Sequence, residues 1–405
     1  MKRTALCLAV SALTASPLVM AATPSAADIE KASVQDLKKY VLALTQRIDE
    51  MEAKTDKVVA HAKPEKTWAD SIQWSGDVRY RYENVDNDAK ADERNRNRIR
   101  ARIGLTAQVT DDVKAGVALV SGSDDPVSGN QTLGGGASSK GIQLDQGWVD
   151  WKFAPNTHLI AGKTKNLYYT PAKSGLIWDG DLRPEGVNLK YDNGTMWAIA
   201  SYHFLESDNK YGDQDAEEMF GGQLGYNGNI NDSTSFVVGA GYYYIPVEGS
   251  ANFVGDPGDF FGNTKVGGLH AMDYKVAEVF AELNTKLAGI PATFFVDFAQ
   301  NTESDADEDT GYAAGFKLGK AKKRGDIEFG YMYEDLEADA VYAAFADSDF
   351  GGGGTDVKGH KLSAALGLSK NTKIGISYYN NEYGDNTPAG ETDYDSLKVD
   401  LVTKF

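Results

Sequence analysis

Polar and apolar residues alternate with a period of two along most of the chain, from Ile72 to the last residue, Phe405. Such alternation places apolar side chains on one face of a β-strand and polar side chains on the other. The clearest runs lie at residues 78–82, 99–109, 294–298, 327–333 and 397–405. Because strands of about 9–11 residues are long enough to cross a membrane when tilted, the pattern predicts strands that meet lipid on one face and water on the other.

The connections between these segments alternate in length. Short turns fall near residues 111–112, 155–156, 192–194, 229–232, 288–289, 322–325 and 370–372. Longer acidic or Gly-rich loops fall near residues 85–93, 122–141, 166–184, 206–218, 247–271, 302–310, 336–357 and 384–393. Seven turns and eight loops join 16 strands, as in outer-membrane barrels with short periplasmic turns and long external loops. We predict an all-β fold, a transmembrane antiparallel β-barrel of about 16 strands over residues 72–405. Barrels of 14 or 18 strands and a secreted β-sandwich are the alternatives.

The first 21 residues have the features of a signal peptide. A basic start at Lys2 and Arg3 precedes an apolar run, and small residues lead to an expected cleavage site after Ala21. A membrane anchor is the alternative, but the apolar run is too short for one. The only Cys, Cys7, lies in this segment, so the mature chain would contain no thiol. No other stretch has the roughly 18 consecutive apolar residues of a membrane helix.

Residues 22–63 are predicted to form a periplasmic coiled-coil helix, and residues 64–71 a polar linker. Ser33 and Asp36 offer a capping box at its start, and Ser25 and Asp28 offer a second candidate. The stripe of heptad a and d positions consists of Val34, Leu37, Val41, Leu44, Ile48, Met51, Thr55 and Val58. Because this stripe is narrow, it favours a short parallel coiled coil over a helix packed on its own domain. An even number of strands would put both chain ends, and thus the helix, in the periplasm.

Five arginines fall at alternate positions of residues 94–102 and therefore share one face of a strand. An arginine facing lipid near the middle of the membrane would cost about 2–4 kcal/mol, so this face should line a water-filled interior. The first and last predicted strands, which close against each other, add three more cations. The predicted pore-lining basic wall consists of Arg79, Arg81, Arg94, Arg96, Arg98, Arg100, Arg102 and Lys398. For Arg94 and Arg96, a loop position that binds lipopolysaccharide phosphate is the alternative.

Three features resemble the family of Gram-negative trimeric porins. The chain ends in Phe405 on an amphipathic strand, which resembles the signal that the barrel-assembly machinery recognises, although Thr403 stands where an aromatic residue is often expected. Residues 178–186 (WDGDLRPEG) of the third loop are similar to a string in the group called putative porins. The Arg-x-Arg run is shared by several porin groups, including phosphate-selective ones. The resemblance covers the mature chain, and it implies that the third loop folds into the pore and that three barrels associate.

By this resemblance the third loop forms the constriction of the pore. Its candidate residues are Tyr168, Tyr169, Lys173, Asp179, Asp181, Arg183 and Glu185. If the loop folds inward, its carboxylates face the basic wall across a narrow aqueous gap, and the transverse field orients dipolar solutes and disfavours apolar ones. Tyr168 and Tyr169 would either stack on solutes or anchor the loop by packing.

The charge balance and the polar motifs exclude several other functions. With 59 Asp plus Glu against 41 Lys plus Arg, the chain is a poor nucleic-acid binder. The acidic run that ends at Asp309 departs from a calcium loop, because Phe316 occupies the position of the bidentate Glu. The five histidines lack metal-ligand spacing and no nucleophile elbow is present, so we expect neither an enzyme nor a cofactor nor a bound metal.

The sequence and the resemblance together predict a porin of the Gram-negative cell outer membrane. We expect a homotrimer in contact with lipid and lipopolysaccharide, through which small hydrophilic solutes and ions diffuse passively. Two alternatives stay open. One is a solute-specific channel for phosphate-like oxyanions that uses the basic wall as a binding ladder, and the other is a barrel adhesin or envelope tether acting through the coiled coil.

Overall fold

The computed structural model describes residues 33–61, 68–206, 217–255, 258–303, 308–387 and 390–405. The chain divides into two compact units, Met1–Thr67 and Trp68–Phe405. The predicted signal peptide lies outside the described residues, as do both ends of the predicted coiled-coil segment. The signal peptide and its cleavage site therefore stay predictions.

The first unit contains one described helix, α3 (Val34–His61). Ser33 and Asp36 form the predicted capping box: the Ser33 hydroxyl donates to Asp36 Oδ2 at 2.5 Å, and the Asp36 amide donates to Ser33 Oγ at 3.3 Å. The apolar a and d side chains from Val34 to Met51 are exposed. No helix in the described part of the chain is long and apolar enough to span a membrane.

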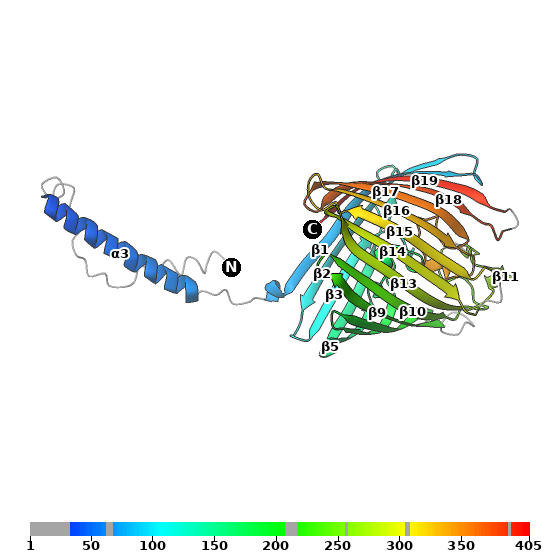
Figure 1. Cartoon of the computed structure of the whole chain (residues 1–405), viewed down its shortest axis with the longest axis horizontal. Helices are drawn as coiled ribbons and strands as arrows, with labels where there is room; N and C mark the ends of the chain where they lie inside the picture. Colours follow the sequence, from blue (N-terminus) through cyan, green and yellow to red (C-terminus); the bar gives the residue numbers. More distant parts are fainter. Residues whose placement is uncertain (1–32, 62–67, 207–216, 256–257, 304–307, 388–389) are drawn as a thin grey trace. The chain divides into compact units, whose positions relative to one another are not determined.

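Sixteen antiparallel strands close the second unit into a barrel, which confirms the predicted fold and strand number (Figure 1). A short 3-10 helix, η1 (Trp68–Ser71), precedes the first strand. The barrel strands are β1 (Ile72–Asn87), β2 (Arg94–Gln108), β3 (Val113–Ser121), β5 (Ile142–Ala154), β6 (Thr157–Lys163), β7 (Glu185–Asp192), β8 (Met196–Glu206), β9 (Glu217–Asn231), β10 (Thr234–Ile245), β13 (Tyr274–Leu287), β14 (Ile290–Asn301), β15 (Thr310–Gly319), β16 (Ile327–Leu336), β17 (Val357–Ser369), β18 (Thr372–Tyr383) and β19 (Thr392–Lys404). Three further short strands lie in loops: β4 (Gln131–Thr132), β11 (Lys265–Val266) and β12 (Leu269–His270).

The last strand closes the barrel against the first. In β1, Asp77 pairs in register with Arg102 of β2 on one side and with Lys404 of β19 on the other. The backbone of the final residue, Phe405, exchanges two hydrogen bonds with Gly76, at 3.0 and 3.1 Å. No strand edge is left open at this seam, which a barrel in lipid requires because lipid offers no hydrogen-bond partners.

The two faces of the strands differ as the period-two pattern predicts. On β1 the outward side chains Trp74, Val78 and Tyr80 are exposed, whereas the inward side chains Arg81 and Glu83 are buried. The same alternation recurs around the barrel, so the outer surface is an apolar band and the polar residues point into the interior.

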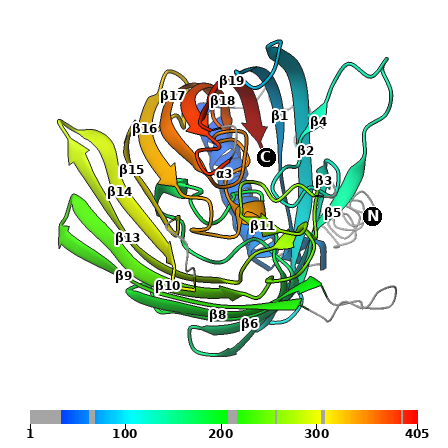
Figure 2. The ribbon, with the colours of Figure 1, turned by 90° about the vertical axis from the view of Figure 1, so that its right-hand side faces the viewer.

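Three external loops fold into the barrel interior. They are the third loop (residues 164–184), the fifth (residues 246–255 and 258–273) and the seventh (residues 337–356) (Figure 2). Together with inward side chains of the strands they form one apolar cluster, which includes Trp178, Val247 and Tyr342. An inward position was predicted for the third loop alone, from the resemblance to porins, and not for the other two.

Candidate pore constriction

The inward faces of β1, β2 and β19 carry seven of the eight predicted wall cations. They are Arg79, Arg81, Arg96, Arg98, Arg100, Arg102 and Lys398, and each is buried or half-buried. Arg94 is the first residue of β2 and is exposed at the rim of the barrel. Arg96 pairs with Glu83 of β1, so it belongs to the strand and not to the loop.

Carboxylates on the same inward faces neutralise much of this wall. Asp77 lies 3.1 Å from Arg100 and 2.7 Å from Arg102. Asp400 of β19 lies 2.7 Å from Arg81. The sequence contained this signal, because Asp77 shares its strand parity with Arg81, but only cations were predicted to form the wall. The wall is therefore a lattice of alternating charges rather than a purely basic surface.

The third loop is fixed to the side of the barrel opposite this wall. The Ser174 hydroxyl donates to Asp297 of β14 at 2.8 Å, and the Ala172 amide donates to Glu282 of β13 at 2.7 Å. The backbone reverses sharply through Ala172 to Gly175, where φ is +84°. A Cβ at Gly175 would lie 2.8 Å from Cβ of Asp347 in the seventh loop, so only glycine permits this approach.

The tip of the third loop touches the charged wall directly. Asp181 receives hydrogen bonds from Arg100 at 2.8 Å and 3.0 Å and from Arg102 at 3.0 Å. Burial opposes ionisation of this carboxyl, but the two guanidinium groups hold its pKa below the ordinary value. The predicted aqueous gap between loop carboxylates and wall is thus absent at Asp181, because ion pairs close it.

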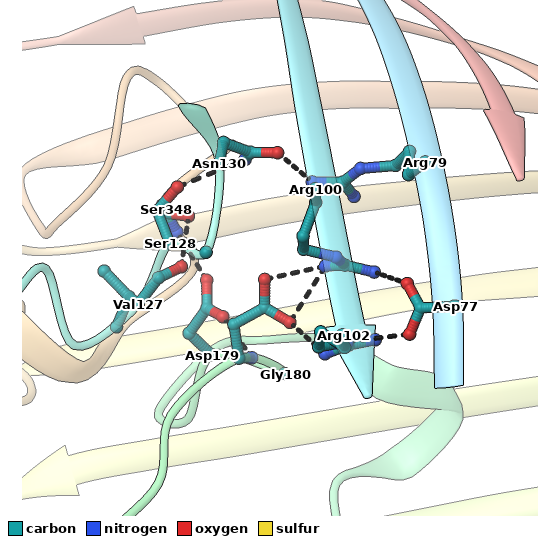
Figure 3. A network of polar contacts seen from close by, with 12 residues as sticks. Asp77, Arg79, Arg100, Arg102, Val127, Ser128, Asn130, Asp179, Gly180 and Ser348 are labelled. Carbon is teal, nitrogen blue, oxygen red and sulfur yellow. Dashed lines mark hydrogen bonds and ion pairs between the residues drawn. The ribbon is translucent and has the colours of Figure 1, made fainter. Parts of the chain in front are cut away.

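Asp179 points away from the charged wall and towards the seventh loop. Its Oδ2 accepts the Ser348 amide at 2.9 Å (Figure 3). Its own amide donates to the Phe345 carbonyl at 2.7 Å. Burial and the nearby carboxylate of Asp347 raise the pKa of Asp179 to about 8. Asp179 therefore joins two loops instead of facing the arginines.

The other predicted constriction residues have different positions. Arg183 lies 3.3 Å from Asp145 of β5. Lys173 is exposed and lines a cavity in the barrel interior. Tyr168 is 6% exposed and packs against Trp178, with ring centroids 5.3 Å apart, so it anchors the loop. Tyr169 is stacked on Phe280, with centroids 5.4 Å apart, and also borders the cavity.

Glu185 does not belong to the constriction. It is the first residue of β7, and its carboxylate lies 2.7 Å from Lys163 at the end of β6. It shares strand parity with Leu189, which is exposed, whereas Asn188 is buried in the interior. Because successive side chains of a strand point to opposite faces, Glu185 lies on the outer face of the barrel.

Two further loops contact the wall, and the sequence analysis missed both. Asn130 of the second loop (residues 122–141) accepts a hydrogen bond from Arg79 at 2.6 Å. Asp349 of the seventh loop lies 2.9 Å from both Arg81 and Lys398. These two cations outweigh burial and hold the pKa of Asp349 well below its ordinary value. No local pattern pairs residues so far apart in the sequence, so no sequence signal was available.

A cavity of about 1080 Å³, the main cavity, lies beside the third loop. Charged groups of both signs line it, among them Arg79, Asp145, Lys165, Lys173, Asp192, Lys361 and Lys404. Within the described ranges, no group of three or more His, Cys, Asp or Glu side chains is arranged to hold a metal ion. The interior therefore presents many hydrogen-bonding and charged groups to a hydrated solute.

Comparison with known proteins gives matches in family and in fold. The family model described as "Putative porin" matches residues 85–257 and 268–405. The high-pH structure of OprB from Pseudomonas putida matches with a TM-score of 0.56 and 13% identity, covering 83% of this chain and 95% of that chain. OmpF from Salmonella typhi, solved in complex with daunomycin, matches with a TM-score of 0.53 and 13% identity, covering 84% of this chain and all of that chain. No curated protein sequence matches.

Proposed function

Since this chain belongs to the putative porin family, we propose that its barrel is a general diffusion channel of the outer membrane. Small hydrophilic solutes and ions pass through its interior, which the inward third loop narrows. The observation that carries this proposal is the course of the third loop, which is bound to Asp297 of β14 through Ser174 and to Arg100 and Arg102 of β2 through Asp181. A cavity of about 1080 Å³ with charged lining residues lies beside it. Hydrated solutes keep hydrogen-bond partners in such a cavity. Apolar solutes would displace water from charged groups without replacing its hydrogen bonds, so their entry costs free energy.

The pairing of charges favours a general channel over a solute-specific anion channel. A ladder for phosphate-like oxyanions needs guanidinium groups that are free to bind the solute. Here Asp77, Asp181 and Asp400 occupy Arg100, Arg102 and Arg81. Concentration-dependent block of the current by phosphate would instead support the anion-specific alternative.

The assembly we propose is a homotrimer with the N-terminal helix in the periplasm. The exposed side chains at the a and d positions of α3, from Val34 to Ile48, support a parallel coiled coil, because a second helix packed against this apolar stripe would bury them. The terminal Phe405, 61% exposed, is available to the barrel-assembly machinery, and the apolar outer band to lipid and lipopolysaccharide. A tether function through the coiled coil is the remaining alternative.

Liposome swelling tests the proposed function. We expect vesicles that contain the mature protein to swell in sugars and amino acids, at rates that fall as the solute becomes larger. In planar bilayers the same preparation should give discrete single-channel currents. A folded barrel that passes neither sugars nor ions would contradict the proposal and favour the tether.

A further inference from the structure

A second hollow, which we call the side recess, opens on the inner side of β2, β3, β5 and β6. Its volume is about 290 Å³, and the start of the third loop, with Thr164, Lys165 and Leu167, lines it. Ser75 and Gln146 line both this recess and the main cavity. The side recess therefore adjoins the main cavity.

Trp148 of β5 gives the side recess an aromatic wall. It lies opposite Gly116 of β3 in the strand register. A Cβ at Gly116 would come within 2.4 Å of the indole ring, so glycine is what allows the ring to lie against the strand backbone. The inward neighbours Gly104 and Ala118 are also small, and they leave the space that the recess occupies.

Polar residues line the recess together with this indole. Ser75 and Thr106 contribute hydroxyl groups, Gln146 an amide, Asp150 a carboxylate and Lys165 an ammonium group. They come from three strands and the third loop, so they approach the recess from several directions. Together they supply both donors and acceptors around an apolar ring face.

From this arrangement we propose that the side recess binds a single pyranose ring, which stacks on Trp148 and forms hydrogen bonds with the surrounding polar groups. A pyranose has an apolar C–H face and a hydroxylated edge, and both find partners here. A purely aromatic solute would leave the polar groups unpaired, and an oxyanion would meet the carboxylate of Asp150. The inference rests on the proposed function, because an open pore is what brings a sugar to the recess.

Saturation-transfer NMR on the full mature protein in detergent tests the site directly, with methyl β-D-galactopyranoside as the probe. We expect saturable binding by the wild type, about tenfold weaker binding by Trp148→Ala and an intermediate value for Trp148→Phe. Trp151→Ala, which removes an exposed indole from the outer face of the same strand, is the matched control and should bind as the wild type does. Glycerol, which has hydroxyl groups but no ring face, should show no saturable signal.

Two outcomes overturn the proposal: no saturable binding by the wild type, or equal affinity in the wild type and Trp148→Ala. Thr106→Val, which keeps the side-chain volume and removes one hydroxyl, gives a second measure if the alanine variant does not fold. Planar bilayers separate this inference from the proposed function. If the sugar binds in detergent but the wild type carries no current, the pore proposal fails and the recess stands.

Discussion

The third loop is held by two walls of the barrel, and the two use different forces. At β1 and β2, ion pairs such as Asp181 with Arg100 hold the loop tip. At β10, β13 and β14, the loop is held by aromatic packing and by hydrogen bonds such as that between Ser174 and Asp297. Buried ion pairs contribute little net stability, because desolvation offsets the attraction, whereas burial of a tryptophan contributes about 3–5 kcal/mol. We infer that the apolar wall keeps the loop inside and the charged wall sets its position.

Removing Trp178 tests the apolar wall and should have the largest effect. This side chain is 3% exposed, and its ring lies 4.9 Å from that of Tyr243. We expect Trp178→Ala to weaken docking of the loop by about 3–5 kcal/mol. In liposomes, trypsin should then cleave after Lys173 much faster, and the mean single-channel conductance should rise. Trp151→Ala on the outer face is the control and should change neither the cleavage rate nor the conductance. If trypsin cleaves the Trp178→Ala variant no faster than the wild type, aromatic packing does not hold the loop inside.

Neutralising Asp181 tests the charged wall, with a smaller effect on docking and a distinct effect on selectivity. Asp181→Asn leaves Arg100 and Arg102 without one of their carboxylate partners. The pore should become more anion-selective, seen as a shifted reversal potential under a KCl gradient, while trypsin cleavage after Lys173 changes little. The double variant with Arg100→Gln should restore much of the original selectivity. A selectivity that stays constant through all three proteins would exclude this wall from the conduction path.

Raising the pH should loosen the contact between the third and seventh loops. The pKa of Asp179 rises from 3.8 to about 8 in the docked loop, so docking favours the protonated carboxyl. Protonation of Asp179 therefore stabilises the docked loop fully at low pH, and this stabilisation is lost as the pH rises from about 4 to about 8. Conductance should therefore increase over this window. Asp347→Asn removes one cause of the raised pKa of Asp179, so the increase in conductance should occur at lower pH. Asp112→Asn, in an exposed turn, is the control and should not shift it.

The smallest effect belongs to Glu185. Its exposed pair with Lys163 lies on the outer face, and such pairs contribute about 0–1 kcal/mol. Glu185→Gln should leave single-channel conductance and reversal potential unchanged. A shift in selectivity comparable to that of Asp181→Asn would mean that the Glu185 side chain faces the pore, which contradicts its outward position on β7.

The strands were predictable from the sequence because each one repeats a local rule. Period-two alternation determined which side chains of β1 and β2 point inward, and turn spacing determined the strand number. Glu185 was predicted to lie in the constriction because it belongs to the third-loop string of residues 178–186, whereas β7 begins at this residue and directs its side chain outwards. The contacts of Asn130 and Asp349 were not predictable, because each joins a loop to a strand that is distant in sequence. Burial of the seventh loop was not predicted either, because a Gly-rich composition is typical of exposed loops.

A disulfide between the third and seventh loops tests the central claim most directly, because Cys7 lies in the expected signal peptide and the mature chain offers no competing thiol. The positions are Asp179 and Ser348, where a carboxylate oxygen and an amide nitrogen lie 2.9 Å apart. We predict that Asp179→Cys with Ser348→Cys forms the bond in mild oxidant and that the locked protein keeps wild-type single-channel conductance. If both thiols instead react freely with an external maleimide and no bond forms, the third loop does not lie inside the barrel.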